Sequence, residues 1–253
     1  MFAVISPAKK LDFSEPVRGI TTQPQLIDET EVLLDETRRL LPSDLSKLMK
    51  ISDQLAELNY GRFQSFELPF TEDNAKQAIF TFNGDTYVGF DAKTLDDEGL
   101  DFAQDHVGIL SGLYGLLRPR DLMQPYRLEM GTRLQNPRGK DLYAFWGDRI
   151  TTAINCALEG HAEPVLVNLA SNEYFKSVKK KELRAEVVTP VFRELKDGKT
   201  KVIGLMAKRA RGMMARYIVE KRIESPKALK KFKEGGYRYV AAESTDTEWV
   251  FIR

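Results

Sequence analysis

The strongest constraint on the fold of this chain is a near-continuous apolar run at residues 164–170, Pro-Val-Leu-Val-Asn-Leu-Ala. Such a run, without alternating polar side chains, is typical of a strand buried on both faces, as in parallel sheets that helices cover. Residues 1–5 are also apolar and end at Ser6-Pro7, where proline removes a backbone donor and favours a turn. Two buried strands of this kind predict an α/β protein with a central sheet flanked by helices.

Hydrophobic periodicity places the remaining elements. No internal repeat, glycine-serine linker or change in composition divides the chain, so we expect one mixed α/β domain over residues 1–253. Glycines at positions 84 and 89 suggest that backbone comes close to a neighbour there. We expect further strands at 78–82, 109–119, 185–192 and 202–207, a terminal hairpin from 237–240 and 248–252, and helices at 24–41, 96–107, 141–159 and 211–222.

Residues from about 43 to 63 predict two short helices joined by a very tight turn. Ser43 and Ser52 are suited to cap the two helices. A helix-hairpin-helix of this kind directs amides of its second helix, and here Lys47 and Lys50, toward a phosphate. Lys50 stands where the DNA-binding form of this motif carries a glycine, and a plain helical hairpin that packs on the core remains the alternative reading.

Positive charge is concentrated in one part of the chain. Between Lys176 and Lys233 there are 19 lysine and arginine residues against 6 acidic ones, about +13, although the whole chain carries a net charge of only +1. This asymmetry predicts a surface for a polyanion, whereas the simpler alternative is a set of solvated helix faces. Few aromatic residues lie among these charges, so duplex DNA fits better than a single strand. An acidic protein is the other partner class left open.

Polar residues follow the predicted strands at the points where the strands end. Ligands of α/β sheets collect beyond the carboxyl ends of the strands, so a pocket for a small molecule or nucleotide is an alternative to capping and loop hydrogen bonds. The polar, proline-containing loop at 120–131 also favours a site. For an enzyme acting on a nucleotide, nucleoside or damaged base, the candidate catalytic residues are Lys9, Asn168, Glu173 and Lys208.

The sequence gives little support for metal or cofactor chemistry. Cys156 is the only cysteine, which excludes an intramolecular disulfide and favours a reducing, cytoplasmic location. His106 and His161 are isolated in the sequence, and no Cys, His and carboxylate spacing matches a ligand set, so we expect no intrinsic metal and no cofactor. No apolar stretch reaches roughly 18 residues, so we expect no membrane-spanning helix.

Several longer blocks occur in a characteristic order. They are Ile-Ser-Pro-Ala-Lys-Lys-Leu-Asp at 5–12, Leu-Ser-Gly-Leu-Tyr-Gly-Leu-Leu-Arg-Pro at 110–119, Met-Gln-Pro-Tyr-Arg-Leu-Glu-Met-Gly at 123–131, Gly-Lys-Asp-Leu-Tyr at 139–143, Asn-Leu-Ala-Ser at 168–171 with Glu-Tyr-Phe-Lys at 173–176, and the basic stretch 208–216. Together they closely resemble the YaaA family of bacterial peroxide-stress proteins, over essentially the whole chain.

This resemblance implies a cytoplasmic protein that limits unincorporated iron during hydrogen peroxide stress. It also implies a single α/β domain with a helix-hairpin-helix and a basic cleft that binds duplex DNA with little sequence preference. The chain departs from the family pattern at Lys10 and Arg120, and both departures add positive charge. The DNA-binding residues that we expect are Lys9, Lys47, Lys50, Arg62, Lys176, Lys208, Arg209, Arg211 and Arg216.

Overall fold

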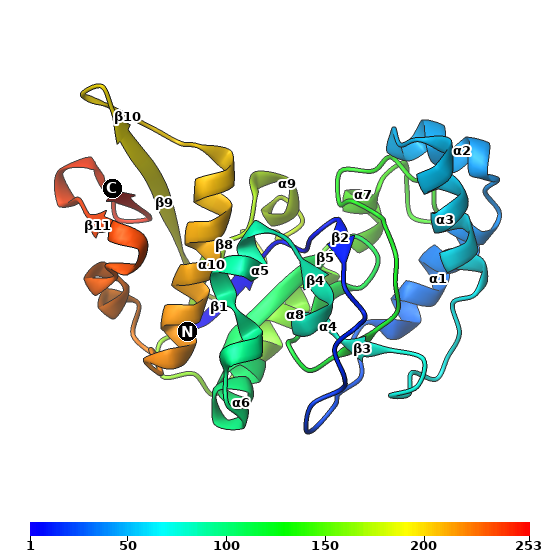
Figure 1. Cartoon of the computed structure of the whole chain (residues 1–253), viewed down its shortest axis with the longest axis horizontal. Helices are drawn as coiled ribbons and strands as arrows, with labels where there is room; N and C mark the ends of the chain where they lie inside the picture. The colour runs from blue at the N-terminus through cyan, green and yellow to red at the C-terminus, as the bar shows by residue number, and fades with distance from the viewer.

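A computed structural model describes all residues, 1–253, and its centre is an eight-stranded mixed sheet (Figure 1). The strand order is β11-β12-β9-β8-β1-β5-β6, with β10 paired to β9. The five strands from β12 to β5 are parallel to their neighbours, whereas β6, β10 and β11 are antiparallel. The strands are β1 (Phe2–Ile5), β5 (Val107–Ser111), β6 (Gly115–Leu117), β8 (Val165–Leu169), β9 (Glu186–Lys196), β10 (Lys199–Lys201), β11 (Arg238–Tyr239) and β12 (Glu248–Ile252).

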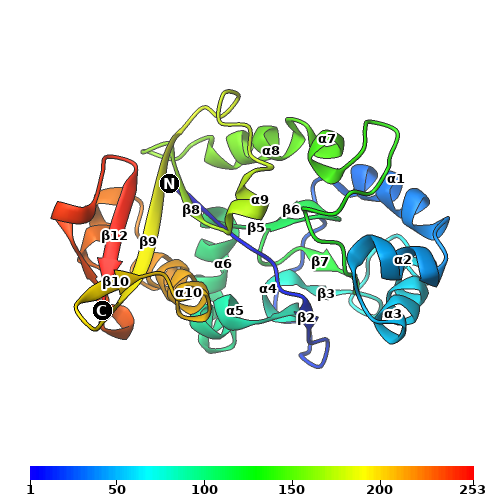
Figure 2. The same ribbon diagram turned by 90° about the horizontal axis from the view of Figure 1, so that it is seen from above.

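The two apolar runs form the middle of this sheet, as predicted. β1 pairs in parallel with β8 on one side and β5 on the other, and every residue of all three strands is buried. These strands lack an exposed face because helices cover both sides. Helices α6 (Asp97–His106) and α10 (Gly204–Glu220) pack on one face, while α8 (Arg149–Leu158) packs on the other (Figure 2).

Three helices form a separate group at one end of the molecule, on the right in Figure 1. They are α1 (Ile27–Arg38), α2 (Pro42–Met49) and α3 (Asp53–Gln64). The two helices expected between 43 and 63 are therefore present as α2 and α3, joined by residues 50–52. Lys50 has the left-handed values φ 53° and ψ 52°, the conformation for which glycine is the usual residue. Ser52 caps α3 by accepting from the backbone N–H of Leu55.

The strand expected at 78–82 is wrong. Residues Ala78–Thr81 form the short helix α4, between the two-residue strands β3 (Lys76–Gln77) and β4 (Phe82–Asn83), and α5 (Asp85–Phe90) follows. β4 pairs with β2 (Lys10–Leu11), and β3 pairs with β7 (Leu122–Met123). All four residues of α4 are buried, and a short apolar run buried on every side has no periodicity that separates helix from strand.

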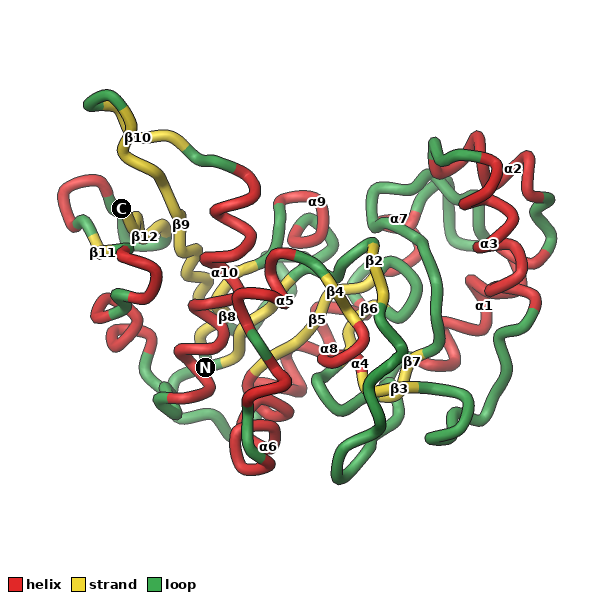
Figure 3. Tube along the Cα trace, in the orientation of Figure 1, coloured by secondary structure: helices red, strands yellow, loops and turns green.

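Three further predictions need correction, and Figure 3 shows the resulting elements. Residues 204–207, expected in a strand at 202–207, instead begin α10, so this helix starts earlier than predicted. The single helix expected at 141–159 is broken into α7 (Leu142–Trp146) and α8 at Gly147, which has φ 53°. The single strand expected at 109–119 is instead the hairpin of β5 and β6, which ends at Leu117. The strand expected at 185–192 and the terminal hairpin are confirmed as β9 and as β11 with β12.

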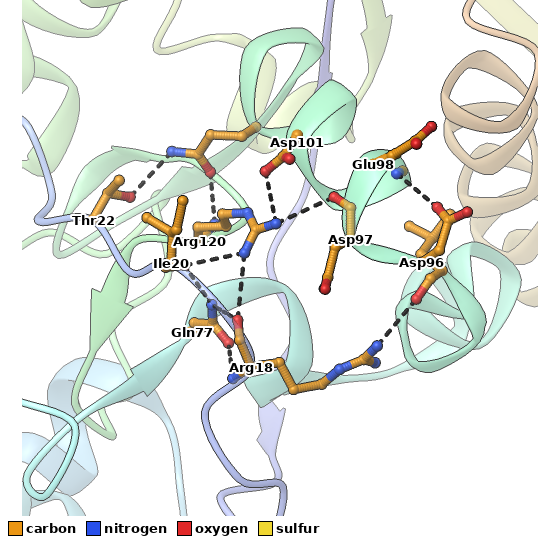
Figure 4. A network of polar contacts seen from close by, with 12 residues as sticks. Arg18, Ile20, Thr22, Gln77, Asp96, Asp97, Glu98, Asp101 and Arg120 are labelled. Carbon is orange, nitrogen blue, oxygen red and sulfur yellow. Dashed lines mark hydrogen bonds and ion pairs between the residues drawn. The ribbon is translucent and has the colours of Figure 1, made fainter.

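Arg120 lies inside the fold, where it contributes no positive charge to the surface. Only 4% of this residue is exposed. Its guanidinium donates to the carbonyl oxygens of Ile20 at 3.2 Å and Asp97 at 3.2 Å, and to Oδ1 of Asp101 at 2.7 Å (Figure 4). Arg120 therefore ties the loop around residues 18–22 to helix α6. None of the helices is both long and apolar enough to cross a membrane.

Candidate functional site

A cavity of about 450 Å³ opens beyond the carboxyl ends of β1 and β8. Its walls come from the segment after β1, from α5, from the loop after β7, from α9 (Asn172–Phe175) and from α10. Viewed from above in Figure 2, α9 lies on one side of this edge of the sheet, and β2, α5 and α10 lie on the other. The cavity is therefore where an α/β sheet is expected to bind a ligand.

Lys9 reaches this cavity because Ser6-Pro7 ends β1 and turns the chain across the sheet edge. Its Nζ forms an ion pair with Oε2 of Glu129 at 2.8 Å, and Arg127 pairs with Oε1 of the same carboxylate at 3.4 Å. Lys9 and Arg127 therefore share one carboxylate, that of Glu129. The Nε of Arg127 is buried and has no hydrogen-bond acceptor, so this guanidinium keeps an unused donor.

Glu173 reaches the cavity from the first turn of α9, which Ser171 caps. The backbone N–H of Gly131 donates to Oε1 of Glu173 at 2.8 Å, which fixes one carboxylate oxygen. The backbone N–H of Ser171 donates to Oγ of Ser6 at 2.8 Å. The segments after β1 and β8 are thereby held together at the mouth of the cavity.

Helix α10 contributes Lys208 and Arg211, which lie one turn apart. Two glycines let α10 cross α5 in backbone contact. A Cβ on Gly212 would lie 1.8 Å from the carbonyl oxygen of Thr86, and one on Gly89 would lie 2.1 Å from that of Arg209. The close approach suggested for Gly89 is thus an approach to α10. Because no side chain separates the two helices, the basic turn of α10 is held against the cavity wall.

Arg211 is the one cation of the cavity that is both half-buried and without a partner, since Lys10 and Lys208 are also unpaired but exposed. It is half-buried, and it forms no hydrogen bond or ion pair with another residue. Burial alone lowers the pKa of its guanidinium, with no carboxylate to offset that effect. A cation removed from water without an anion costs free energy, so Arg211 is the group in this cavity with the greatest capacity for an added anion.

Buried tyrosines form the less polar part of the wall. Tyr87 donates its hydroxyl to the carbonyl oxygen of Ser6 at 3.1 Å, and the hydroxyl of Tyr126 is 2.6 Å from Oγ of Ser111. Burial raises the pKa of Tyr87, Tyr126 and Tyr174 above the usual value, so all three are neutral phenols. Since the hydroxyls of Tyr87 and Tyr126 are already bonded, these residues offer ring surface rather than free donors.

The structure brings together three of the four residues proposed for catalysis, namely Lys9, Glu173 and Lys208. Asn168 does not line the cavity. It lies within β8 and is buried, where its Oδ1 accepts from the backbone N–H of Ala170 and its Nδ2 donates to Thr189 on β9. The Asn168 side chain therefore connects β8 to β9 and does not face the cavity. Tyr87 and Arg127, which the sequence did not single out, belong to the site, and the loop at 120–131 was the available signal for Arg127.

The basic residues expected to bind DNA fall into different positions. Lys208 and Arg209 are exposed and unpaired on α10, and Lys47 and Lys50 are exposed on the α2–α3 unit. Arg62 on α3 is half-buried. Burial and the nearby charge of Arg127 both lower the pKa of Arg62, so its guanidinium lies near the loop at 120–131 that carries Arg127.

Two of the expected cations are held by the protein itself. The guanidinium of Arg216 donates to the carbonyl oxygens of Phe90 and Asp91 and pairs with Glu220 at 2.8 Å. Nζ of Lys176 lies 4.6 Å from the centre of the Tyr143 ring, in a cation–π contact. Arg216 therefore anchors α10 to α5, whereas Lys176 remains exposed beside the mouth of the cavity.

A second cavity, of about 520 Å³, lies around the start of β1, and His106, His161 and Cys156 line part of it. Nδ1 of His161 is 2.8 Å from the Met1 amine, and the two imidazole rings are 4.7 Å apart between centres. No group of three or more His, Cys, Asp or Glu side chains in the chain has an arrangement that could hold a metal ion.

Comparisons with known proteins give one consistent result. The model of a family described as "Peroxide stress protein YaaA" matches residues 1–243. A UPF0246 protein of Alteromonas mediterranea is 56% identical over 255 residues, covering 100% of this chain and 98% of the relative. UPF0246 proteins of Magnetococcus marinus and Burkholderia mallei are 56% and 57% identical, and each match covers all of this chain and at least 98% of the relative.

Proposed function

This chain belongs to the YaaA family of peroxide stress proteins, and we propose that it serves in that response by binding duplex DNA without catalysis. The observation that carries the proposal is the convergence of basic side chains at one edge of the sheet. Lys9, Lys10, Arg127, Lys208 and Arg211 all line the same cavity, and exposed Arg209 adjoins it on α10. The limitation of unincorporated iron that the family resemblance implies belongs to the same proposal.

Phosphate contacts of exposed lysine and arginine carry most of such an interaction. They require charge and reach rather than base-specific geometry, so sequence preference is expected to be slight. The α2–α3 unit extends the proposed surface with Lys47 and Lys50. The left-handed backbone at Lys50 supports the comparison with a helix-hairpin-helix, because this is the conformation that a hairpin glycine adopts.

Fluorescence anisotropy with a short duplex, measured across a salt series, tests this proposal. We expect affinity to fall steeply with salt, because each phosphate contact releases counterions. The double substitution Lys208→Gln and Arg209→Gln should weaken binding and reduce the salt slope by about 2. Lys227→Gln with Lys231→Gln is the matched control, since it removes the same charge from exposed positions on η2 (Pro226–Lys231), away from the cavity.

The contribution of the α2–α3 unit can be separated from that of α10. Lys50→Gly removes a charge while giving the hairpin the residue that its backbone favours, so loss of DNA affinity in this variant cannot result from strain. Absence of binding by the wild type at low salt would refute the proposal. If the protein captures one acidic protein stoichiometrically, and nuclease treatment does not reduce this capture, a protein partner would be favoured instead.

A second candidate function is an enzyme that acts on a nucleotide, nucleoside or damaged base. The observation in its favour is that Lys9, Glu173 and Lys208 line one cavity. Incubation of nucleotides and of oxidised duplexes with the protein, followed by chromatography, tests it. Product that forms with the wild type but not with Glu173→Gln would support the enzyme, and unchanged substrates would argue against it.

A further inference from the structure

The cavity at the sheet edge combines three kinds of surface in one space. Arg211 supplies a half-buried guanidinium without a partner, and Lys208 lies one helical turn away. Tyr87 and Tyr126 supply aromatic rings whose hydroxyls are already bonded to the protein. Glu173 supplies a carboxylate with only one oxygen fixed by a backbone N–H.

Each surface matches one part of a nucleotide. A guanidinium binds the two oxygens of a phosphate in a forked geometry, and the low polarity around Arg211 strengthens that contact. The exposed parts of the Tyr87 and Tyr126 rings offer apolar contact to any base, whatever its sequence. A carboxylate accepts hydrogen bonds from the amino and imino groups of base edges. The volume of about 450 Å³ lies within the range of small-molecule pockets, at roughly 300–1,000 Å³.

We propose that this cavity binds one nucleotide, with its phosphate at Arg211 and its base against the tyrosine wall. The nucleotide has two possible sources, a free mononucleotide or a nucleotide extruded from a duplex that lies on the surrounding basic surface. Extrusion takes a base out of its stack, which costs free energy, and a pocket that receives the base offsets that cost. The second source rests on the proposed DNA binding, whereas the first does not.

Two substitutions provide a matched test. Arg211→Gln removes the half-buried unpaired cation from the cavity, and Lys227→Gln removes the same charge from an exposed position on η2, away from the cavity. Arg211→Lys retains the charge and should restore part of the lost affinity. Thermal melting shows whether each variant is folded, and Arg211 forms no hydrogen bond or ion pair that the substitution would break.

Calorimetric titration with AMP, adenosine and inorganic phosphate addresses the free ligand. We expect AMP to bind the wild type more tightly than phosphate or adenosine does. Arg211→Gln should lose at least tenfold in AMP affinity, because a hydrogen bond between a guanidinium and a phosphate is stronger than one between neutral groups. Lys227→Gln should not change the AMP affinity. Equal affinities for AMP and phosphate would overturn the base-binding part of the proposal.

A duplex with a central 2-aminopurine addresses extrusion, because this base becomes brighter when it leaves the stack. If DNA is the source, the wild type and Lys227→Gln should increase the fluorescence and Arg211→Gln should not, although anisotropy still reports duplex binding. Duplex binding without AMP binding and without this fluorescence increase would overturn the nucleotide site alone. AMP binding that depends on Arg211, without duplex binding, would uphold the site and refute the proposed DNA function.

Discussion

Arg120 shows how one residue can have a charge that suggests binding and a position that serves the fold. Its guanidinium donates to three backbone carbonyls and one carboxylate, and Gln77 shares two of these carbonyls, those of Arg18 and Ile20. We expect Arg120→Lys to lower the free energy of unfolding by about 1–3 kcal/mol, because a buried ammonium cannot reach the same set of acceptors. Urea unfolding measures the effect. Exposed Arg39→Lys should change stability by less than about 0.5 kcal/mol, and equal effects would contradict this role.

Asp121, the neighbour of Arg120, gives a pH dependence with a defined sign. Its carboxylate is fully buried and accepts from Thr22 Oγ1 at 2.6 Å and from the backbone N–H of Arg118 at 2.7 Å. Burial raises the pKa of Asp121 to about 6. The folded state therefore binds this proton more tightly than the unfolded state, so the contribution of Asp121 to stability is complete below about pH 4 and is lost as the pH rises through 6.

Asp121→Asn removes this titration. The free energy of unfolding of the wild type, relative to that of Asp121→Asn, should fall by about 3 kcal/mol between pH 4 and pH 7, since each pKa unit corresponds to about 1.4 kcal/mol. Urea titrations of both proteins at several pH values give the difference. A difference that does not vary with pH would show that the carboxylate is already ionised at pH 4.

Two of the cavity residues that the sequence identified lie in the segments after buried strands, whereas Lys208 lies on α10 and not after the strand that was expected at 202–207. Lys9 comes after β1 and Glu173 after β8, and parallel strands bring both to the same edge. The same reasoning was wrong in placing Asn168 in the cavity, because Asn168 is the penultimate residue of β8 and its side chain forms hydrogen bonds within the sheet. The special position of Arg211 depends on the absence of a partner, and a sequence carries no signal of that.

At the scale of elements, the crossing of α5 and α10 determines where the basic turn lies. Gly212→Ala places a methyl group 1.8 Å from the Thr86 carbonyl oxygen, so the helices must separate. We expect a loss of about 1–3 kcal/mol in the free energy of unfolding, the usual cost of overpacking. Gly204→Ala is the control, because nothing lies within 4 Å of a Cβ at that position of the same helix. A Gly212→Ala protein as stable as the control would show that the crossing is loose.

The elements that sequence misplaced share a cause. Val202 and Ile203 favour a strand, and only four further residues separate them from Lys208, so the local pattern is too short to distinguish strand from helix. α10 packs on the sheet and on α5 through residues that are buried from Ala207 onward, and its first three residues extend the same helix without being buried. The apolar stripe from 141 to 159 continues past Gly147, where a positive φ ends α7. Periodicity of apolar residues does not reveal either boundary.

For the molecule as a whole, the charge asymmetry of the sequence corresponds only in part to a free basic surface. Arg193, Arg216 and Arg222 each pair with an acidic residue from elsewhere in the structure or on the same helix. Lys208 and Arg209 remain exposed without such a partner. Which of these cations remain unpaired depends on the packing of distant segments, which composition does not reveal.

His106 and His161 join distant parts of the molecule and predict its response to acid. His106 ends α6, His161 follows α8, and the Met1 amine at the start of β1 contacts His161. Burial lowers the pKa of both histidines, and the positive amine of Met1 adds to this effect, although Asp105 and Glu224 partly oppose it. The folded state therefore binds protons more weakly than the unfolded state, so stability should fall as the pH drops below about 6.5.

This acid response is opposite in sign to that of Asp121, and substitution separates the two. The double variant His106→Gln and His161→Gln should retain more of its stability than the wild type when the pH falls from 7 to 5, because no imidazole has to be charged in a buried position. Urea titrations of both proteins give a difference curve in which the contribution of Asp121 cancels. A flat difference curve would contradict the prediction. If the difference grows as the pH falls, the two imidazoles make the packing of β1, α6 and the segment between α8 and β8 sensitive to acid.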